Sequence, residues 1–167
     1  MSTANSPITS PRPGRARLDP RGPRFGAAIT AVLLLGVVFL SLTGASFAAL
    51  ILLSVLTGLF AWGALAGAGR HPYGVLFKKF VQPRLAPPAE LEDAAPPTFA
   101  QGIGLAVTLV GVALGLAGVP GAVGTAAAVA FVAAFLNAVF DYCLGCQIYL
   151  LLVRFRALNR RARVSGA

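Results

Sequence analysis

The residues whose types and spacing suit chemistry lie close together in the last apolar segment of the chain. Cys143 and Cys146 form a Cys-x-x-Cys pair, and Asn137, Asp141 and Gln147 lie on either side of it. Such a pair can cycle between dithiol and disulfide, bind a soft metal or carry a persulfide, and each use needs the thiolate. Cysteine also packs as a small apolar side chain. The residues alone therefore leave redox or sulfur chemistry, structural packing and metal binding open.

The polar neighbours of the pair would control its reactivity. On a continuous helix Asn137 and Asp141 share a face, and a buried Asp141 would stay protonated or take a donor such as Asn137. Polar groups inside a membrane span are costly, which makes them functional candidates. An apolar setting and an ionised Asp141 would both disfavour a thiolate, unless Gly145 admits water or a partner. The candidate catalytic residues are Cys143, Cys146 and Asp141, and no metal ligand is assigned. The candidate binding residues are Asn137, Gln147, Tyr149, His71, Glu90, Glu92 and Asp93.

These residues must be positioned by membrane-spanning helices. The chain is 57% hydrophobic and 11% charged, whereas soluble domains are about 25% charged. No charge lies between Arg24 and Arg70 or between Asp93 and Asp141, and each stretch is long enough for two spans of about 20 residues. Turn residues at 43–46 and 118–121 divide the stretches. We predict an all-α membrane protein, a bundle of four transmembrane helices over 25–42, 47–68, 99–117 and 123–153.

The fourth predicted helix is longer than a bilayer requires. If Arg154 marks the inner interface, the two cysteines lie about 12 to 16 Å inside it. A helix over 123–153 must tilt, protrude or unwind to fit about 30 Å of hydrocarbon, and Gly145 is the predicted weak point.

The basic residues predict the orientation. The net charge is +9, and every Lys and Arg falls in one of three segments outside the uncharged stretches: Arg12, Arg15, Arg17, Arg21 and Arg24; Arg70, Lys78, Lys79 and Arg84; Arg154, Arg156, Arg160, Arg161 and Arg163. With four helices these segments share one side, and the positive-inside rule makes that side the cytoplasm. We expect cytoplasmic tails at 1–24, disordered, and at 157–167, basic. This topology explains the charge, attraction to anionic lipid headgroups is its consequence, and no nucleic-acid partner is expected.

The central loop, 69–98, contains a predicted interfacial helix and an acidic cluster. Val75, Leu76 and Phe80 would share the lipid-facing side of a short helix, with Lys78 and Lys79 reaching the headgroups. Proline residues end this helix. The acidic cluster, Glu90, Glu92 and Asp93, is interpreted as a solvated face that offsets Arg84, with a substrate or metal site as the alternative. A capping box over 98–101, in which Gln101 reaches back to the chain at Thr98, would begin the third helix.

Several segments together resemble a known family. They are Asp19-Pro-Arg-Gly-Pro-Arg-Phe-Gly26, His71-Pro-Tyr-Gly-Val-Leu-Phe77, Pro83-Arg-Leu, Glu90-Leu-Glu-Asp93, Phe99-Ala-Gln101 and Asn137-Ala-Val-Phe-Asp-Tyr-Cys-Leu-Gly-Cys-Gln-Ile-Tyr-Leu150. Over about 19–156 the chain resembles the bacterial membrane family called domain of unknown function 4395. The resemblance implies a multi-pass protein of the bacterial inner membrane that works beside thioredoxin-like or rhodanese-type sulfurtransferase proteins. Asp141 departs from the family pattern, in which a small or apolar residue is usual.

The sequence therefore yields one leading hypothesis and two alternatives. The leading one is thiol–disulfide redox or sulfur handling through Cys143 and Cys146, as a membrane thiol–disulfide oxidoreductase with a soluble thioredoxin-like or rhodanese-type partner. Asp141 and Asn137 would manage protons, and the loop would dock the partner. The alternatives are a small transporter or channel subunit for a sulfur-containing solute, and a non-catalytic membrane anchor for a soluble partner. The cofactor stays unassigned, and the partners beyond the lipid bilayer include a second copy of the chain.

Overall fold

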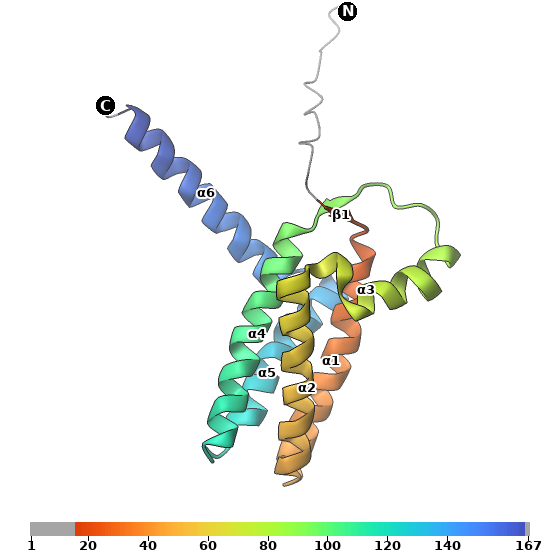
Figure 1. The fold of residues 1–167 in the computed structure, drawn as a ribbon, viewed down its shortest axis with the longest axis vertical. Coiled ribbons are helices and arrows are strands. Elements are labelled where there is room, and N and C mark those ends of the chain that lie inside the picture. Colours follow the sequence, from red (N-terminus) through yellow and green to blue (C-terminus); the bar gives the residue numbers. More distant parts are fainter. Residues whose placement is uncertain (1–15, 166–167) are drawn as a thin grey trace, which may run out of the picture.

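The protein is a bundle of two helical hairpins (Figure 1). The computed structural model describes residues 16–165, with side chains over 16–159. The first hairpin consists of α1 (Arg21–Leu42) and α2 (Ser46–Ala66). The second consists of α4 (Ala95–Leu116) and α5 (Ala122–Phe140). All four helices are long and apolar enough to cross a membrane, which confirms the predicted all-α membrane fold.

Both hairpin turns lie where the sequence predicts them. The first turn separates Leu42 from Ser46, and Gly44 adopts a φ of 82° there. The second turn uses Gly118 at 77° and Gly121 at 75°. Positive φ angles are readily accessible to glycine. The two turns lie at one end of the bundle, and the central loop lies at the other (Figure 1).

Contacts between the two hairpins hold the bundle together. Helix α1 packs mainly against α5, and α2 packs mainly against α4. The buried core is formed by Leu34, Val37, Ala49, Leu53, Leu56, Ala127 and Ala130. Within the second hairpin, a Cβ on Gly115 would lie 2.5 Å from Val123 Cγ2, so α4 and α5 approach closely because glycine is there. Close packing of small residues is how helices associate in lipid.

Residues 17–24 are ordered, which contradicts the disorder predicted there: they form β1 and the start of α1. Strand β1 (Arg17–Leu18) pairs antiparallel with β2 (Glu92–Asp93). Helix α1 begins at Arg21 because Asp19 accepts hydrogen bonds from the Arg21 backbone N–H at 3.0 Å and from its guanidinium at 2.8 Å. These bonds lower the pKa of Asp19. The rest of the predicted N-terminal tail, residues 1–15, lies outside the described residues.

Helix α4 begins at Ala95, four residues before the predicted start. Asp93 Oδ1 accepts the Ala95 N–H at 2.9 Å. The predicted capping box is wrong, because the Thr98 hydroxyl donates back to Ala94 O at 2.7 Å and accepts from Ala68 N–H at 3.1 Å. The side chain of Gln101 makes no hydrogen bond within the described residues.

The central loop contains short helices that cross the end of the bundle. They are η1 (Ala68–Arg70), α3 (Pro72–Leu76), the π turn η2 (Phe77–Val81) and η3 (Gln82–Arg84). Phe77, 3% exposed, is the buried anchor, and its ring lies 5.8 Å from that of Phe25 in α1. Val75, Leu76 and Phe80 stay exposed, so the apolar side predicted to meet lipid lies on the surface of the described chain.

The single helix predicted over 123–153 is wrong. Helix α5 ends at Phe140, and a separate helix, α6 (Leu144–Ser165), begins four residues later. Helix α6 points away from the bundle at the end where the central loop lies (Figure 1). It includes residues 157–165, which the sequence analysis assigned to a tail.

Candidate functional site: a cysteine pair where α6 begins

The site is formed by the break between α5 and α6. Asp141 ends α5 in the left-handed conformation, with a φ of 58°, and the Tyr142 N–H donates back to Leu136 O at 3.2 Å. The chain then turns, and Cys143 immediately precedes α6. The break places the Cys-x-x-Cys pair on the first turn of a helix instead of in the middle of one.

Cys143 caps the helix that carries its partner. Its Sγ accepts the backbone N–H of Cys146 at 3.3 Å, and its carbonyl accepts the N–H of Gln147 at 3.0 Å. This is the arrangement of an N-cap residue, whose side chain satisfies a free N–H of the first turn. The two sulfurs form a disulfide, and the Cα atoms are 5.2 Å apart, within the usual range for a disulfide. Both cysteines are partly exposed.

Two contacts hold the start of α6 against α4. Gly145, between the cysteines, is buried, and a Cβ there would lie 2.5 Å from Ala100 Cβ and 2.6 Å from Ala100 Cα. One helical turn later, Tyr149 lies against Phe99, with ring centroids 5.7 Å apart. The glycine between the cysteines therefore permits close helix packing.

Asp141 is neither buried nor beside Asn137 on a continuous helix. Its side chain is 61% exposed, and its Oδ1 lies 3.5 Å from Arg24 Nε of α1. The Arg24 guanidinium also donates to Ala138 O at 3.4 Å. The burial of Asp141 expected from the sequence is therefore wrong, because the helix ends before this residue. The ion pair ties the chain just before Cys143 to α1.

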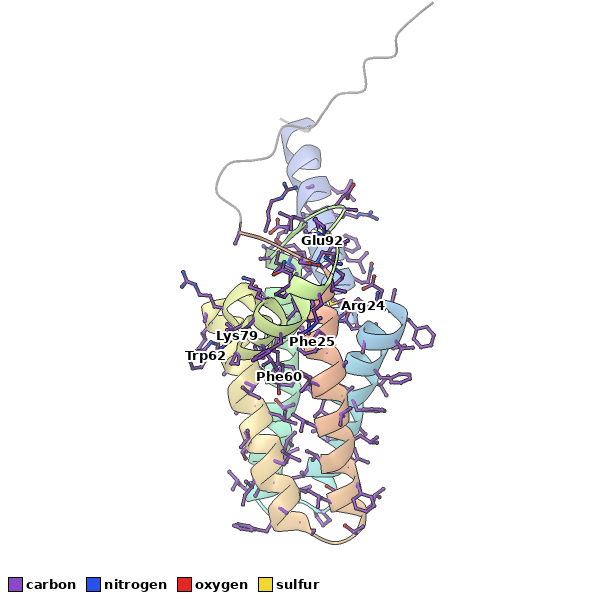
Figure 2. The ribbon with its side chains drawn as sticks, turned by 90° about the vertical axis from the view of Figure 1, so that its right-hand side faces the viewer. Arg24, Phe25, Phe60, Trp62, Lys79 and Glu92 are labelled. Atoms are coloured by element: carbon purple, nitrogen blue, oxygen red, sulfur yellow. A yellow bond between two sulfur atoms is a disulfide. The ribbon has the colours of Figure 1, made fainter. Side chains whose placement is uncertain are left out.

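The cysteine pair lies at the loop end of the bundle, not deep in a spanning helix. Figure 2 shows Arg24 at the end where Lys79 and Glu92 also lie. Because Asp141 pairs with Arg24 and Cys143 follows two residues later, the disulfide is at this end. The predicted depth of about 12 to 16 Å is wrong because α6 leaves the bundle instead of continuing α5.

A cavity of about 420 Å³ adjoins the disulfide. Cys143 and the first residues of α6 form part of its wall, and α1, α3, η2, α4 and α5 form most of the rest. Most of the wall is apolar. Three polar side chains on it, Thr30, Gln101 and Asn137, make no hydrogen bond within the described residues. Of these three, only Asn137 was predicted as a site residue. Thr30 and Gln101 could have been found by the same signal, a polar residue within an apolar span.

His71 is buried at the cavity wall as a structural group. Its Nε2 lies 3.2 Å from Leu59 O, and its Nδ1 accepts the Tyr73 N–H at 3.2 Å. The ring is therefore neutral, with the proton on Nε2. Burial lowers the pKa of His71. The nearest ring belongs to Tyr73, with centroids 4.8 Å apart.

We expect His71 to make the fold less stable in mild acid. The unfolded chain binds a proton near pH 6.5 and the folded chain only at lower pH, so stability is full above about 6.5 and is lost as the pH falls below it. Thermal unfolding in detergent between about pH 7.5 and 5 should show this decline. His71→Asn keeps an acceptor for Tyr73 N–H and should show a flatter profile. Equal slopes in both proteins would contradict the assignment.

The remaining predicted site residues do not converge on the disulfide. Glu90 and Glu92 are exposed in the central loop, and Asp93 caps α4. Gln147 is exposed on α6, and Tyr149 packs on Phe99. Within the described part of the chain, no three His, Cys, Asp or Glu side chains are grouped to hold a metal ion.

Comparison with known proteins gives one match. Residues 18–154 match the family model described as Domain of unknown function (DUF4395). No curated protein and no solved structure matches the chain. The matched range covers both hairpins, the central loop and the cysteine pair, and it ends within α6.

Proposed function

The chain belongs to the DUF4395 family of domains of unknown function, and from this premise we propose that it is a membrane thiol–disulfide oxidoreductase. Cys143 and Cys146 exchange electrons, or pass sulfur, with a soluble thioredoxin-like or rhodanese-type protein. One observation carries the proposal: the disulfide lies on the first turn of α6, where the Cys146 N–H meets Cys143 Sγ at 3.3 Å.

The first turn of a helix favours the thiolate. Its free N–H groups and the positive end of the helix dipole stabilise a negative charge. Here the N–H of Cys146 is directed at Cys143, so after reduction the charge is best held on Cys143. The sequence argued against a thiolate because the pair would lie inside an apolar span. That argument does not apply to a pair on the first turn of α6.

The exchange is balanced within the two dithiols. A thiolate of the reduced partner attacks the disulfide, forming a mixed disulfide and releasing one cysteine as a thiolate. The partner's second thiol then attacks the mixed disulfide, which leaves the partner oxidised and Cys143 and Cys146 reduced. Two electrons and two protons reach this chain, and the reverse sequence returns them. Partial exposure of both cysteines gives the partner access.

The partner is cytoplasmic in this proposal. The described basic side chains lie in the loop, at the start of α1 and along α6, and the positive-inside rule assigns that side to the cytoplasm of a bacterial inner membrane. The disulfide lies on the same side. Lys78 and Lys79 of η2, with the arginines of α6, favour a partner whose docking surface is acidic.

Thiol trapping in cells tests the proposal. The chain contains only two cysteines, so alkylation with a mass tag reports this pair alone. We expect the pair to shift between free and blocked states when cells meet oxidant or sulfur stress, with Cys143→Ser and Cys146→Ser as gel standards. Thiols that stay reduced in every condition would contradict exchange and favour an anchor or transport role.

A further inference from the structure

The cavity beside the disulfide is unexplained by exchange with a soluble protein. A dithiol that receives electrons from one partner must pass them to another acceptor before it can work again. The wall of the cavity includes Cys143 itself, so a molecule bound there lies beside the residue that best holds the charge. This inference rests on the proposed function and concerns the second half of its cycle.

The cavity is shaped for a ligand from the membrane. Its wall begins at Asp19, beside the loop, and continues along α1 from Gly22 to Thr30. These two residues of α1 are about 12 Å apart along the helix axis. The deeper wall is apolar, with Val107 from α4 and Val129 from α5. A volume of about 420 Å³ is in the range of cofactor and small-molecule sites. The charged side chains of the wall, Arg17, Asp19 and Lys78, come from the segment before α1 and from the central loop.

The unpaired polar groups on the wall call for a ligand with oxygen atoms. Thr30, Gln101 and Asn137 come from three different helices, and none has a hydrogen-bond partner within the described residues. Gln101 Oε1 is buried against Gly63, which is not on the wall, so the amide N–H groups of Gln101 are what this side chain can offer a ligand. An acyl chain would leave these groups unpaired, which is unfavourable in an apolar site. Carbonyl oxygens would accept from the amide groups.

We propose that the cavity binds a membrane quinone, which is the electron acceptor for the Cys143–Cys146 dithiol. The ring lies beside Cys143, its carbonyl oxygens accept hydrogen bonds from the side chains of Gln101 and Asn137, and its isoprenoid tail leaves toward lipid. The dithiol loses two S–H bonds and gains one S–S bond. The quinone gains the two electrons and the two protons and becomes a quinol.

The test uses the full chain in lipid nanodiscs. The protein is reduced, freed of reductant and mixed with a short-chain ubiquinone or menaquinone analogue, and the quinone is followed by its ultraviolet absorbance. We expect one quinone to be reduced per protein, with the disulfide formed in step. Cys143→Ser should give none.

Matched substitutions separate the cavity from its surroundings. Gln101→Leu and Asn137→Leu each remove hydrogen-bonding groups from the wall and should slow quinone reduction about tenfold. Ser41→Ala removes an unpaired buried hydroxyl from a residue of α1 that is not on the wall, and it should leave the rate unchanged. Equal rates in all three variants would overturn the site.

Reduction of the same disulfide by a soluble thioredoxin is measured in parallel. A protein that exchanges with thioredoxin but leaves every quinone oxidised would overturn the quinone site and keep the proposed function. A disulfide that thioredoxin does not reduce would contradict the proposed function itself. If only an acyl chain or detergent occupies the cavity, the protein will exchange with thioredoxin and leave every quinone oxidised.

Discussion

Reduced protein carrying Cys146→Ser is expected to accumulate a mixed disulfide with an oxidised thioredoxin, and protein carrying Cys143→Ser is not. In the first variant Cys143 keeps its place before α6, and its thiolate attacks the partner's disulfide. No second thiol of this chain remains to resolve the product, and rapid acid quenching followed by alkylation blocks the partner's released thiol before it can reverse the attack. In the second variant the remaining thiol lies within the helix and lacks the N–H that Cys143 receives from residue 146. We expect its attack to be about tenfold slower.

Non-reducing gels and mass spectrometry of the adduct measure this difference. The double variant without cysteines serves as the blank, and both single variants must first show unchanged thermal unfolding. Faster adduct formation through Cys146 than through Cys143 would reverse the assigned roles and would contradict the argument from the helix N-terminus.

The largest effect outside the cysteines is expected from Gly145→Val. The new side chain would overlap Ala100, since even a Cβ at Gly145 would lie 2.5 Å from Ala100 Cβ. Overpacking of this kind costs about 1 to 3 kcal/mol, and the strain is relieved when α6 moves away from α4. The disulfide then loses its place beside the bundle. We expect thiol exchange to fall about a hundredfold, as when a reacting group is misplaced.

Gly102→Val is the matched control. Gly102 lies on α4, two residues from Ala100, and a Cβ there meets nothing within 4 Å. Exchange kinetics with a small disulfide and with thioredoxin should be normal in this variant. If Gly145→Val exchanged as fast as wild type with both, the contact between α4 and α6 would have no part in positioning the pair.

The bundle could be predicted from the sequence because its signals are local. Long uncharged stretches interrupted by glycine predicted both hairpins and their turns, and the structure confirms them. The pairing of Arg17 with Asp93 was not predicted, because two-residue strands have no periodicity and their partners lie far apart in the chain. The early starts of α1 and α4 follow from aspartate side chains two residues before each helix.

The break before Cys143 was missed because hydropathy continues across it. Tyr142, Leu144 and Ile148 extend the apolar run, and no proline marks an end. Left-handed Asp141, its ion pair with Arg24 and the fit of Gly145 on Ala100 depend on contacts between helices, which helical periodicity does not report. The excess length of the predicted helix was the signal that it could not remain whole.

The order of elements repeats along the chain. Each hairpin follows a two-residue strand and an aspartate that caps its first helix, Asp19 for α1 and Asp93 for α4. The first helix of each half packs on the second helix of the other. The two halves therefore share one order of strand, aspartate and hairpin, and they pack on each other reciprocally.

The segments that follow the two hairpins differ in chemistry. After the first hairpin His71 caps α3, and after the second Cys143 caps α6. Both residues reach the wall of the same cavity. The first segment is anchored by the buried Phe77, and the second is a projecting helix with a disulfide at its base. The two halves therefore contribute different groups to one cavity, a buried imidazole from the first and a disulfide-bonded cysteine from the second.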